Sequence, residues 1–422
     1  MRDTFRSLKN SNYRIWAAGA LVSNIGSWMQ RTTQDWIVLT DLTHQNATAV
    51  GIVMGLQFGP QILLLPLTGF AADHFDRRKL LFCTQAAMGL LALGLDLLVV
   101  TGLVQLWHVY TFAFLLGCTA AFDSPARQTF VAELVSADDL PNAVGLNSTS
   151  FNAARMIGPA IAGLMIAGVG SGWVFLLNAL SFVAVLGALG VVRVDRPATT
   201  RRGPDGGGLI EGFRYVLRRA DLKIILFMLF LVGTFGLNFP IYISTMSVTV
   251  FHKGAGQYGL SSSIMAIGSV TGALLSARRA KPHIALLFSV SAVFGLGLAL
   301  AALMPNYALF CAALVVVGVA AQSFTTTATA TVQLATEPAM RGRVMAILLA
   351  IALGGTPLGA PIVGWIADAF GPRWALGVGA AAGVASALVG VHYLTRYRNL
   401  RVRIDAGRLR FRLDEPVPES IA

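Results

Sequence analysis

The chain has 422 residues, of which 55% are hydrophobic and only 12% are charged, and its formal net charge is +12. Charged residues make up about a quarter of ordinary soluble domains, so this composition excludes a soluble globular protein and predicts one that crosses a membrane many times. The three cysteines and six histidines are scattered without ligand spacing, so we expect neither a disulfide nor a metal site.

Apolar stretches near the roughly 20 residues that a spanning helix needs recur along both halves of the chain. They lie at about residues 15–40, 47–72, 80–102, 107–128, 143–168, 173–193, 222–247, 257–277, 283–304, 307–330, 344–369 and 374–395. The predicted fold is an all-α polytopic membrane protein with twelve transmembrane helices in two six-helix bundles related by internal duplication. We expect the bundles at residues 1–192 and 222–396, a cytoplasmic linker at 193–221 and a basic cytoplasmic tail at 397–422.

Lysine and arginine residues gather in alternate loops. When the N-terminus is placed in the cytoplasm, nearly all of them fall on the cytoplasmic side. This positive-inside asymmetry predicts a protein of the cytoplasmic (inner) membrane with both termini in the cytoplasm. The asymmetry explains the basic charge without a nucleic-acid partner. The Arg-rich segment at 400–413 has the pattern of a small hairpin, and we expect the basic tail to contact anionic membrane lipid.

The first predicted span carries charged and amide side chains, which are rare inside membranes and mark functional sites. Arg31 and Asp35 lie four residues apart on one helix face. Asp35 is the leading candidate for proton coupling, with Arg31 as its partner; the alternative is a static ion pair near the outer surface. Asp96 in the third span is a second candidate proton carrier. Candidate substrate contacts in the first span are Asn24, Gln30 and Gln34.

The loop between the second and third spans combines small and charged residues. The stretch at 69–79 resembles the major facilitator superfamily signature Gly-x-x-x-Asp-Arg-x-Gly-Arg-Arg, with His74 and Asp76 as departures from it. We expect its residues to act as a gating loop, together with two charged residues at the cytoplasmic end of the fourth span; a purely topological charge cluster is the alternative. These gating candidates are Gly69, Asp73, Asp76, Arg77, Arg78, Asp123 and Arg127.

Two glycine-rich stretches repeat 201 residues apart and indicate a duplication. The pairs are Gly158 with Gly359, Gly163 with Gly364, Gly170 with Gly371, Trp173 with Trp374, and Arg77–Arg78 with Arg278–Arg279. Small residues let helices approach closely, and a proline bends a helix, so these stretches predict seams on which the bundles pivot; ordinary packing is the alternative. The proposed seam residues are Gly145, Gly158, Pro159, Gly163, Gly359, Pro361 and Gly364.

Three further polar residues are candidate substrate contacts. Arg155, one turn before the fifth-span glycine, either meets an anionic substrate or forms a salt bridge, for example with Asp123. The second half has almost no charge inside its spans and offers Asn238, Gln322 and the threonine-rich run at 325–331, so its contacts should be hydroxyl, amide and aromatic.

A narrower resemblance rests on residues 23–30, 123–128, 152–159 and 341–345, which are similar to the enterobactin-exporter-like branch of that superfamily, the transmembrane secretion effectors. The resemblance implies a monomer that exports siderophores, antibiotics or other amphiphilic small molecules in exchange for protons. The superfamily's frequent arginine in span four is Ala113 here. No nucleotide-binding or catalytic motif is present, so neither an enzyme nor a cofactor is expected. A passive facilitator or importer, and a non-transporting receptor or scaffold, are the alternatives.

Overall fold

The computed structural model describes residues 5–136, 138–192, 209–277, 284–397, 401–405 and 408–412. Its first part contains η1 (Arg6–Lys9), α1 (Ser11–Ile37), η2 (Val38–Leu42), α2 (Ala47–Leu63), α3 (Leu65–His74), α4 (Arg77–Val100), α5 (Leu106–Leu134), α6 (Leu140–Val169) and α7 (Ser171–Val191). Its second part contains α8 (Leu209–Arg218), α9 (Ala220–Leu231), η3 (Val232–Gly236), α10 (Phe239–Thr245), η4 (Met246–Val250), α11 (Ala255–Ala277), α12 (Ile284–Leu303), α13 (Tyr307–Ala335), α14 (Pro338–Phe370), α15 (Pro372–Tyr397), β1 (Arg401–Asp405) and β2 (Arg408–Arg412).

Side-chain caps and glycines fix several of these helix ends. Asn46 accepts a hydrogen bond from the backbone of Ala49 at the start of α2, and Asp76 accepts one from Lys79 at the start of α4. Such caps satisfy backbone N–H groups that have no partner within the helix. At their other ends α6 and α14 both stop at a glycine with positive φ, 95° at Gly170 and 102° at Gly371, so the duplicated helices end in the same way.

The helices confirm an all-α polytopic membrane protein. Within the described part of the chain, nine segments are long and apolar enough to cross a membrane: α4, α6, α7, the run from α9 to η4, α11, α12, α13, α14 and α15. The apolar helix α2 is shorter, and α1 and α5, which carry buried charged and amide side chains, do not meet the same criterion. Twelve membrane crossings therefore stay a prediction. The predicted hairpin is present, since β1 pairs antiparallel with β2.

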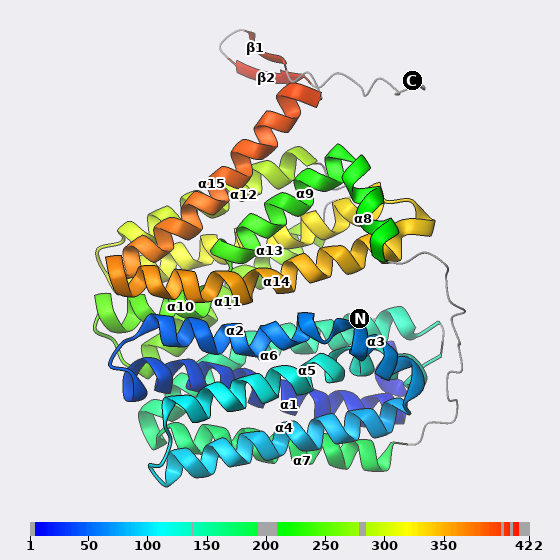
Figure 1. Ribbon diagram of the computed structural model, residues 1–422, viewed down its shortest axis with the longest axis vertical. Coiled ribbons are helices and arrows are strands. Elements are labelled where there is room, and N and C mark those ends of the chain that lie inside the picture. The colour runs from blue at the N-terminus through cyan, green and yellow to red at the C-terminus, as the bar shows by residue number, and fades with distance from the viewer. Residues whose placement is uncertain are drawn as a thin grey trace.

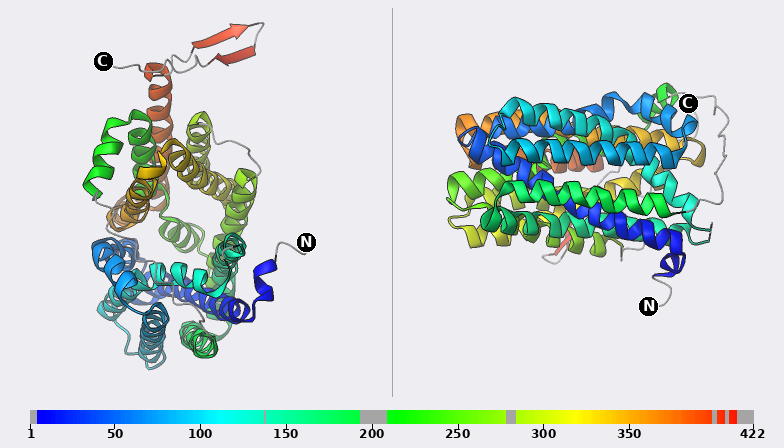
Figure 2. Two further views of the ribbon diagram at one scale, coloured as in Figure 1. Left: turned by 90° about the vertical axis from the view of Figure 1, so that its right-hand side faces the viewer. Right: turned by 90° about the horizontal axis from the view of Figure 1, so that it is seen from below.

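Two groups of helices lie side by side (Figure 1; Figure 2). In the first group α1 packs on α6 and α7, and α4 packs on α5 and α7; in the second, α13 packs on α11 and α12, and α12 on α15. The groups meet where α2 packs on α14 and where α6 packs on α11. The bundle boundaries predicted from sequence stay predictions, and the predicted linker lies outside the described residues except for α8 and the start of α9.

The two ends of the molecule differ in charge. The loops at residues 43–46 and 251–254 lie at one end, on the left in Figure 1, which we call the 43–46 end. At the opposite end, the basic end, Arg6 contacts Asp139 at 2.5 Å, Arg77 contacts Glu133 at 2.6 Å and Arg343 contacts Glu211 of α8 at 3.0 Å. The membrane orientation of these ends stays a prediction.

The glycine-rich helices α6 and α14 each pack closely on a helix of their own group. A Cβ atom added at Gly158 would lie 2.6 Å from Trp28 Cβ in α1. A Cβ added at Gly359 would collide with the backbone of Thr234 in η3. Only glycine allows these approaches, and the two helices use the same repeat position for them.

Five residues further along, each helix touches the other group. A Cβ added at Gly163 would lie 2.6 Å from the carbonyl oxygen of Ala255 in α11, and one at Gly364 would collide with the backbone of Ala47 in α2. The duplication therefore relates the two contacts between the groups as well. In one of them α6 of the first group touches the second group, and in the other α14 of the second group touches the first.

The duplication has a second register, in which equivalent residues lie 208 instead of 201 residues apart. This register relates the segment between α1 and α2 to the segment between η4 and α11. His44 and His252 lie 208 residues apart and have φ angles of 50° and 51°, rare values for residues other than glycine. Gly51 and Gly259 share that separation, and a Cβ at either would collide with the backbone of the opposite group, at Ala360 and Pro159 respectively. The sequence analysis did not find this register.

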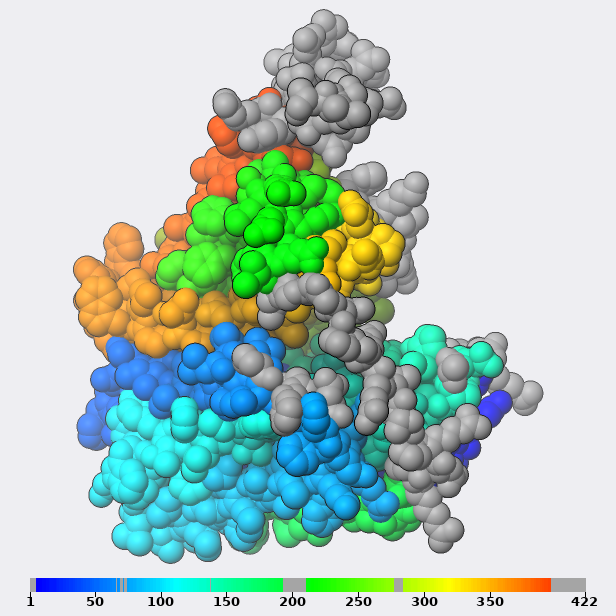
Figure 3. Space-filling view, turned by 45° about the vertical axis from the view of Figure 1, so that its right-hand side comes forward, coloured from blue at the N-terminus to red at the C-terminus, as the bar shows by residue number. Residues whose placement is uncertain are grey.

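The contacts between the groups are closest toward the 43–46 end. The pair α6 and α11 is in contact from Gly163 to Met156, whose carbonyl accepts a hydrogen bond from Ser263 at 2.7 Å. Nearer the basic end, a Cβ at Gly145 would have nothing within 4 Å, so Gly145 makes no seam contact in this conformation and its role stays a prediction. Figure 3, turned toward the basic end, shows the surface indented between the groups on its right-hand side.

Candidate functional site

A cavity of about 190 Å³ lies between the two groups. Nine residues of the first group line it, from α1, α2 and α6: Trp28, Arg31, Thr32, Asp35, Met54, Gln57, Phe58, Arg155 and Pro159. Nine residues of the second group line the opposite wall, from the η3–α10 region, α11 and α14: Leu237, Phe239, Pro240, Ile243, Tyr258, Ser262, Met265, Ala266 and Thr356.

Positions that the duplication relates face each other across this cavity. At separations of 208 or 201 residues, the pairs are Arg31 with Phe239, Thr32 with Pro240, Asp35 with Ile243, Met54 with Ser262, Gln57 with Met265, Phe58 with Ala266 and Arg155 with Thr356. The first group thus supplies a charged wall, defined by Arg31, Asp35 and Arg155. The second group supplies a neutral wall at the same positions, and a site with these two walls suits an amphiphilic molecule.

On the charged wall, Arg31 stacks between aromatic rings. Its guanidinium carbon lies 5.3 Å from the ring centre of Trp28 and 5.4 Å from that of Phe58. Asp35 is 6% exposed and lies one turn further along α1, yet no ion pair or hydrogen bond joins Arg31 to Asp35 in the described structure. Within the described residues, no contact supports the alternative of a static ion pair.

Arg155 reaches the same aromatic ring from α6. Its guanidinium carbon lies 5.9 Å from the ring centre of Trp28, and no ion pair involving Arg155 occurs among the described residues. The salt bridge considered with Asp123 is absent, because Asp123 pairs with Arg127 at 3.1 Å instead. Beside them, the buried side-chain nitrogen of Gln57 has no hydrogen-bond partner within the described part of the chain.

The amides predicted on α1 lie outside the cavity. Asn24 accepts a hydrogen bond from Arg127 at 3.1 Å, and Gln30 accepts one from Asn178 of α7. Gln34 is 1% exposed and does not line the cavity. Because successive residues of a helix point about 100° apart, Gln30 and Gln34 turn away when Arg31 and Asp35 face the cavity.

The other predicted polar contacts also lie away from the cavity. Asn238 is fully buried and donates to the carbonyl of Thr234 at 2.7 Å, and Gln322 donates to Thr326 at 3.2 Å along α13. Asp96 is 4% exposed and lies beside the start of α7, where it does not line the cavity either. The hydroxyl and aromatic groups of the second wall come instead from Phe239, Tyr258, Ser262 and Thr356.

The predicted gating charges connect helices of the first group. Asp123 accepts hydrogen bonds from Thr84 at 2.9 Å and Gln85 at 2.6 Å, both in α4. Arg77 pairs with Glu133 of α5, and Arg78 donates to the backbone carbonyls of Leu189 and Gly190 at the end of α7. The network therefore joins α1, α4, α5 and α7, and within the described residues its hydrogen bonds and ion pairs all stay in the first group.

Part of the gating loop cannot be assigned a contact. The structure does not describe the surroundings of Gly69 or the side chain of Asp73. The repeat pair Arg278–Arg279 lies outside the described residues. Asp76, at the position where the superfamily signature has glycine, caps α4.

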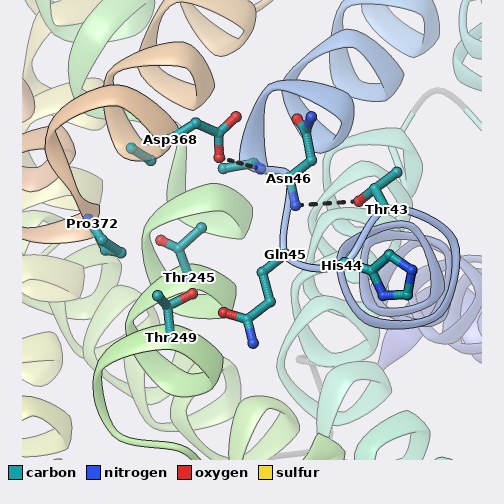
Figure 4. Close-up of a pocket in the computed structure, with 10 residues that line it drawn as sticks. Thr43, His44, Gln45, Asn46, Thr245, Thr249, Asp368 and Pro372 are labelled. Carbon is teal, nitrogen blue, oxygen red and sulfur yellow. Dashed lines mark hydrogen bonds between the residues drawn. The ribbon is translucent and has the colours of Figure 1, made fainter.

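An aspartate links the two groups at the 43–46 end. Asp368 of α14 accepts hydrogen bonds from the backbone N–H groups of Ala47 at 2.7 Å and Thr48 at 2.8 Å, and from the Thr48 hydroxyl at 2.5 Å. The carboxylate thus sits at the positive N-terminus of α2. It borders a second pocket of about 340 Å³ that also includes Thr245 of α10 (Figure 4). This contact has to break if the groups separate at this end.

Replacing Asp368 tests that contact. We expect Asp368→Asn to increase the rate at which a membrane-impermeant maleimide labels Thr245→Cys, because Thr245 is 1% exposed in this structure. Loss of charge-assisted hydrogen bonds worth about 1.5–3 kcal/mol predicts a rise of about tenfold or more. The background is a variant whose cysteines, Cys83, Cys118 and Cys311, are replaced. Asp41→Asn, which changes an exposed aspartate of η2, is the control, and equal labelling in both variants contradicts the assignment.

No group of three or more histidine, cysteine, aspartate or glutamate side chains within the described ranges could hold a metal ion. The polar and aromatic groups that line the cavity are its arginines, its aspartate, its amide and its aromatic rings.

Comparisons with known proteins agree with this architecture. A sequence model of the transmembrane secretion effector family matches residues 3–405. The chain is 27% identical to the staphyloferrin A transporter of Staphylococcus aureus over 82% of this chain and 87% of that protein. It is 25% identical to the enterobactin exporter EntS of Escherichia coli over 85% of this chain and 86% of that one.

Among solved structures, the nucleoside transporter NupG superposes with a TM-score of 0.68 at 14% identity, covering 92% of this chain and 100% of that one. A bacterial homologue of the iron transporter ferroportin, in an inward-facing state, superposes with a TM-score of 0.68 at 15% identity, covering 92% and 99%. At these identities the superpositions show a shared fold alone.

Proposed function

Because the chain belongs to the transmembrane secretion effector family of major facilitator superfamily transporters, we propose that it is a secondary-active exporter that moves a small amphiphilic molecule out of the cell by alternating access. The observation that carries the proposal is the cavity between two duplicated groups of helices, with charged groups on one wall and apolar and hydroxyl groups on the other. Transporters built from parallel repeats bind substrate at the interface of the repeats and rock one repeat against the other.

Alternation is supported by where the groups touch. The glycine contacts of α6 with α11 and of α14 with α2, and the Asp368 contact, all lie toward the 43–46 end. Toward the basic end, a Cβ at Gly145 would meet nothing within 4 Å, and the surface is indented between the groups (Figure 3). We assign the basic end to the cytoplasm and both termini to the same side of the inner membrane, because basic loops stay inside. The conformation is then open to the cytoplasm, as an exporter requires when it loads substrate. We propose that the protein works as a monomer and that its basic tail contacts anionic lipid.

Siderophores are the substrate class that we favour. Two curated relatives that match more than four fifths of the chain are named for staphyloferrin A and enterobactin. Other amphiphiles, including antibiotics and drugs, also combine polar and apolar parts, which suit the charged wall and the neutral wall of the cavity.

Asp35 is the group that we propose to couple transport to protons, with Arg31 beside it on α1. Asp35 lines the cavity, and no side-chain hydrogen bond or ion pair occupies its carboxylate in the described structure, so this group is available to the cavity contents. While ionised, it accepts a hydrogen bond from a hydroxyl or amide of the substrate. After the substrate leaves, the Asp35 carboxylate binds a proton, and the empty transporter returns to its loading state. Each elementary charge that crosses 100 mV contributes about 2.3 kcal/mol to the drive.

Flux measurements with the unmodified protein test the proposed function. Inside-out vesicles that contain the protein should accumulate at least one member of a siderophore panel above its external concentration, and a protonophore should abolish the excess. Vesicles without the protein are the control. Equilibration without accumulation would identify a facilitator, and accumulation only in right-side-out vesicles would identify an importer; either result contradicts the proposed export.

A further inference from the structure

We propose that the substrate carries an anionic oxygen group and that Arg31, Arg155 and Gln57 hold this group against Trp28. The inference rests on the proposed transport function and names the chemical class of what is transported. It also assigns an orientation, in which the anionic end faces α1, α2 and α6 and the apolar end faces α10 and α11.

The charges of the cavity are not balanced by the protein. Among its lining residues are two arginines and one aspartate. Arginine stays protonated in proteins, so both guanidinium groups are cations in every step of the cycle. Neither belongs to an ion pair in the described structure, and even an ionised Asp35 leaves one positive charge in excess. An anionic group on the substrate neutralises the loaded cavity.

The two guanidinium groups converge on one aromatic ring. Their carbons lie 5.3 Å and 5.9 Å from the ring centre of Trp28, although Arg31 comes from α1 and Arg155 from α6. Contact with a ring face orients a guanidinium group but leaves its N–H groups free to donate in the plane. Two such groups on neighbouring helices form a site for a carboxylate, catecholate or similar oxygen anion, which prefers charge-assisted hydrogen bonds.

Gln57 adds an uncharged donor to the same wall. Its side-chain nitrogen is buried and lacks a hydrogen-bond partner within the described residues, although the residue lines the cavity. A buried donor without a partner costs free energy, and an oxygen atom of a ligand would satisfy it. The charged wall therefore offers more donors than acceptors, which favours an oxygen anion over a cation.

The duplication argues against a purely structural need for these donors. The positions equivalent to Arg31, Arg155 and Gln57 in the second group hold Phe239, Thr356 and Met265, and they line the opposite wall of the same cavity. The fold therefore accepts neutral residues at these places. The arginines cost desolvation in a membrane protein, and a ligand of opposite charge offsets that cost.

Binding to the purified full-length protein in lipid nanodiscs tests the proposal with three probes of matched shape: 2-naphthoate, 2-naphthalenemethanol and 2-naphthylmethylammonium. We expect the anion to bind at least about tenfold more tightly than the other two probes. Arg31→Gln and Arg155→Gln should each remove most of that preference, and Arg155→Lys should restore part of it. Empty nanodiscs correct for partition into lipid, and Arg373→Gln, which lies in the first turn of α15 outside the cavity, is the matched control.

The outcomes separate this inference from the proposed function. Equal or tighter binding of the cation or the alcohol overturns the anion site, as does an equal loss for all three probes in the arginine variants. If that result accompanies protonophore-sensitive accumulation in vesicles, the exporter stands and the anion site falls. Anion-selective binding that depends on both arginines, without flux in vesicles, supports the anion site and contradicts the exporter.

Discussion

Gly163→Leu and Gly364→Leu should each abolish most transport. Both glycines form the seams between the two groups toward the 43–46 end, where an added Cβ meets the backbone of Ala255 or Ala47. Backbone cannot move aside as a flexible side chain can, so the helices must separate. Overpacking costs about 1–3 kcal/mol, which shifts the balance between closed and open states of this end by about tenfold or more.

The matched control for the seam variants is Gly168→Leu, because Gly168 is exposed on the same helix as Gly163 and a Cβ there meets nothing within 4 Å in this structure. Transport of the vesicle substrate and maleimide labelling of Thr245→Cys would be measured for all three variants. We expect lost transport and faster labelling for the two seam variants and near-normal values for the control. Normal transport by the seam variants would show that close contact of the groups at this end is not part of the cycle.

Asp35→Asn should convert accumulation into equilibration. The amide still offers hydrogen bonds to a substrate but cannot gain and lose a proton, so binding persists while the proton gradient no longer drives the cycle. We expect the accumulation ratio in inside-out vesicles, with the membrane potential clamped near zero, to fall to about one, and the pH dependence of the rate to flatten. The charged and titratable groups that share the cavity with Asp35 are Arg31, Arg155 and Tyr258, so none of them replaces a carboxylate as the carrier near neutral pH.

Asp96→Asn provides the comparison for that experiment. Asp96 is also a buried aspartate in a predicted span, but it lies beside the start of α7 and does not line the cavity. Its variant should still accumulate substrate. Retained accumulation by Asp35→Asn together with loss in Asp96→Asn would move the proposed coupling site from α1 to α4.

Sequence patterns predicted the helical architecture and the duplication because hydropathy and glycine spacing act locally. The repeat of Gly158 and Gly163 at Gly359 and Gly364 predicted close helix contacts, and the structure contains them. The second register, with His44 and His252, escaped notice because the separation there is 208 residues and few identities mark it. Which helices a glycine touches depends on three-dimensional packing, and Gly145 shows that a glycine on the same helix can touch none.

The cavity was predicted in part. Arg31, Asp35 and Arg155 line it, as their rarity inside membrane spans suggested. Gln30 and Asn238, which are equivalent under the second register, both turn away from it. Helical periodicity could have found Trp28 and Thr32, since they share a face with Arg31 and Asp35. The neutral wall carries no charge that would have singled it out in the sequence.

Purified protein in proteoliposomes, with imposed gradients as the only energy source, gives the most direct test of secondary-active export. The substrate would be the compound found in the vesicle panel, and the protein would be oriented with its basic end outward. The account predicts that substrate accumulates inside above its external concentration while an inward-acidic proton gradient is present and the membrane potential is clamped near zero, and that the excess disappears when the proton gradient is dissipated. A ratio that stays at one under both conditions would contradict the account.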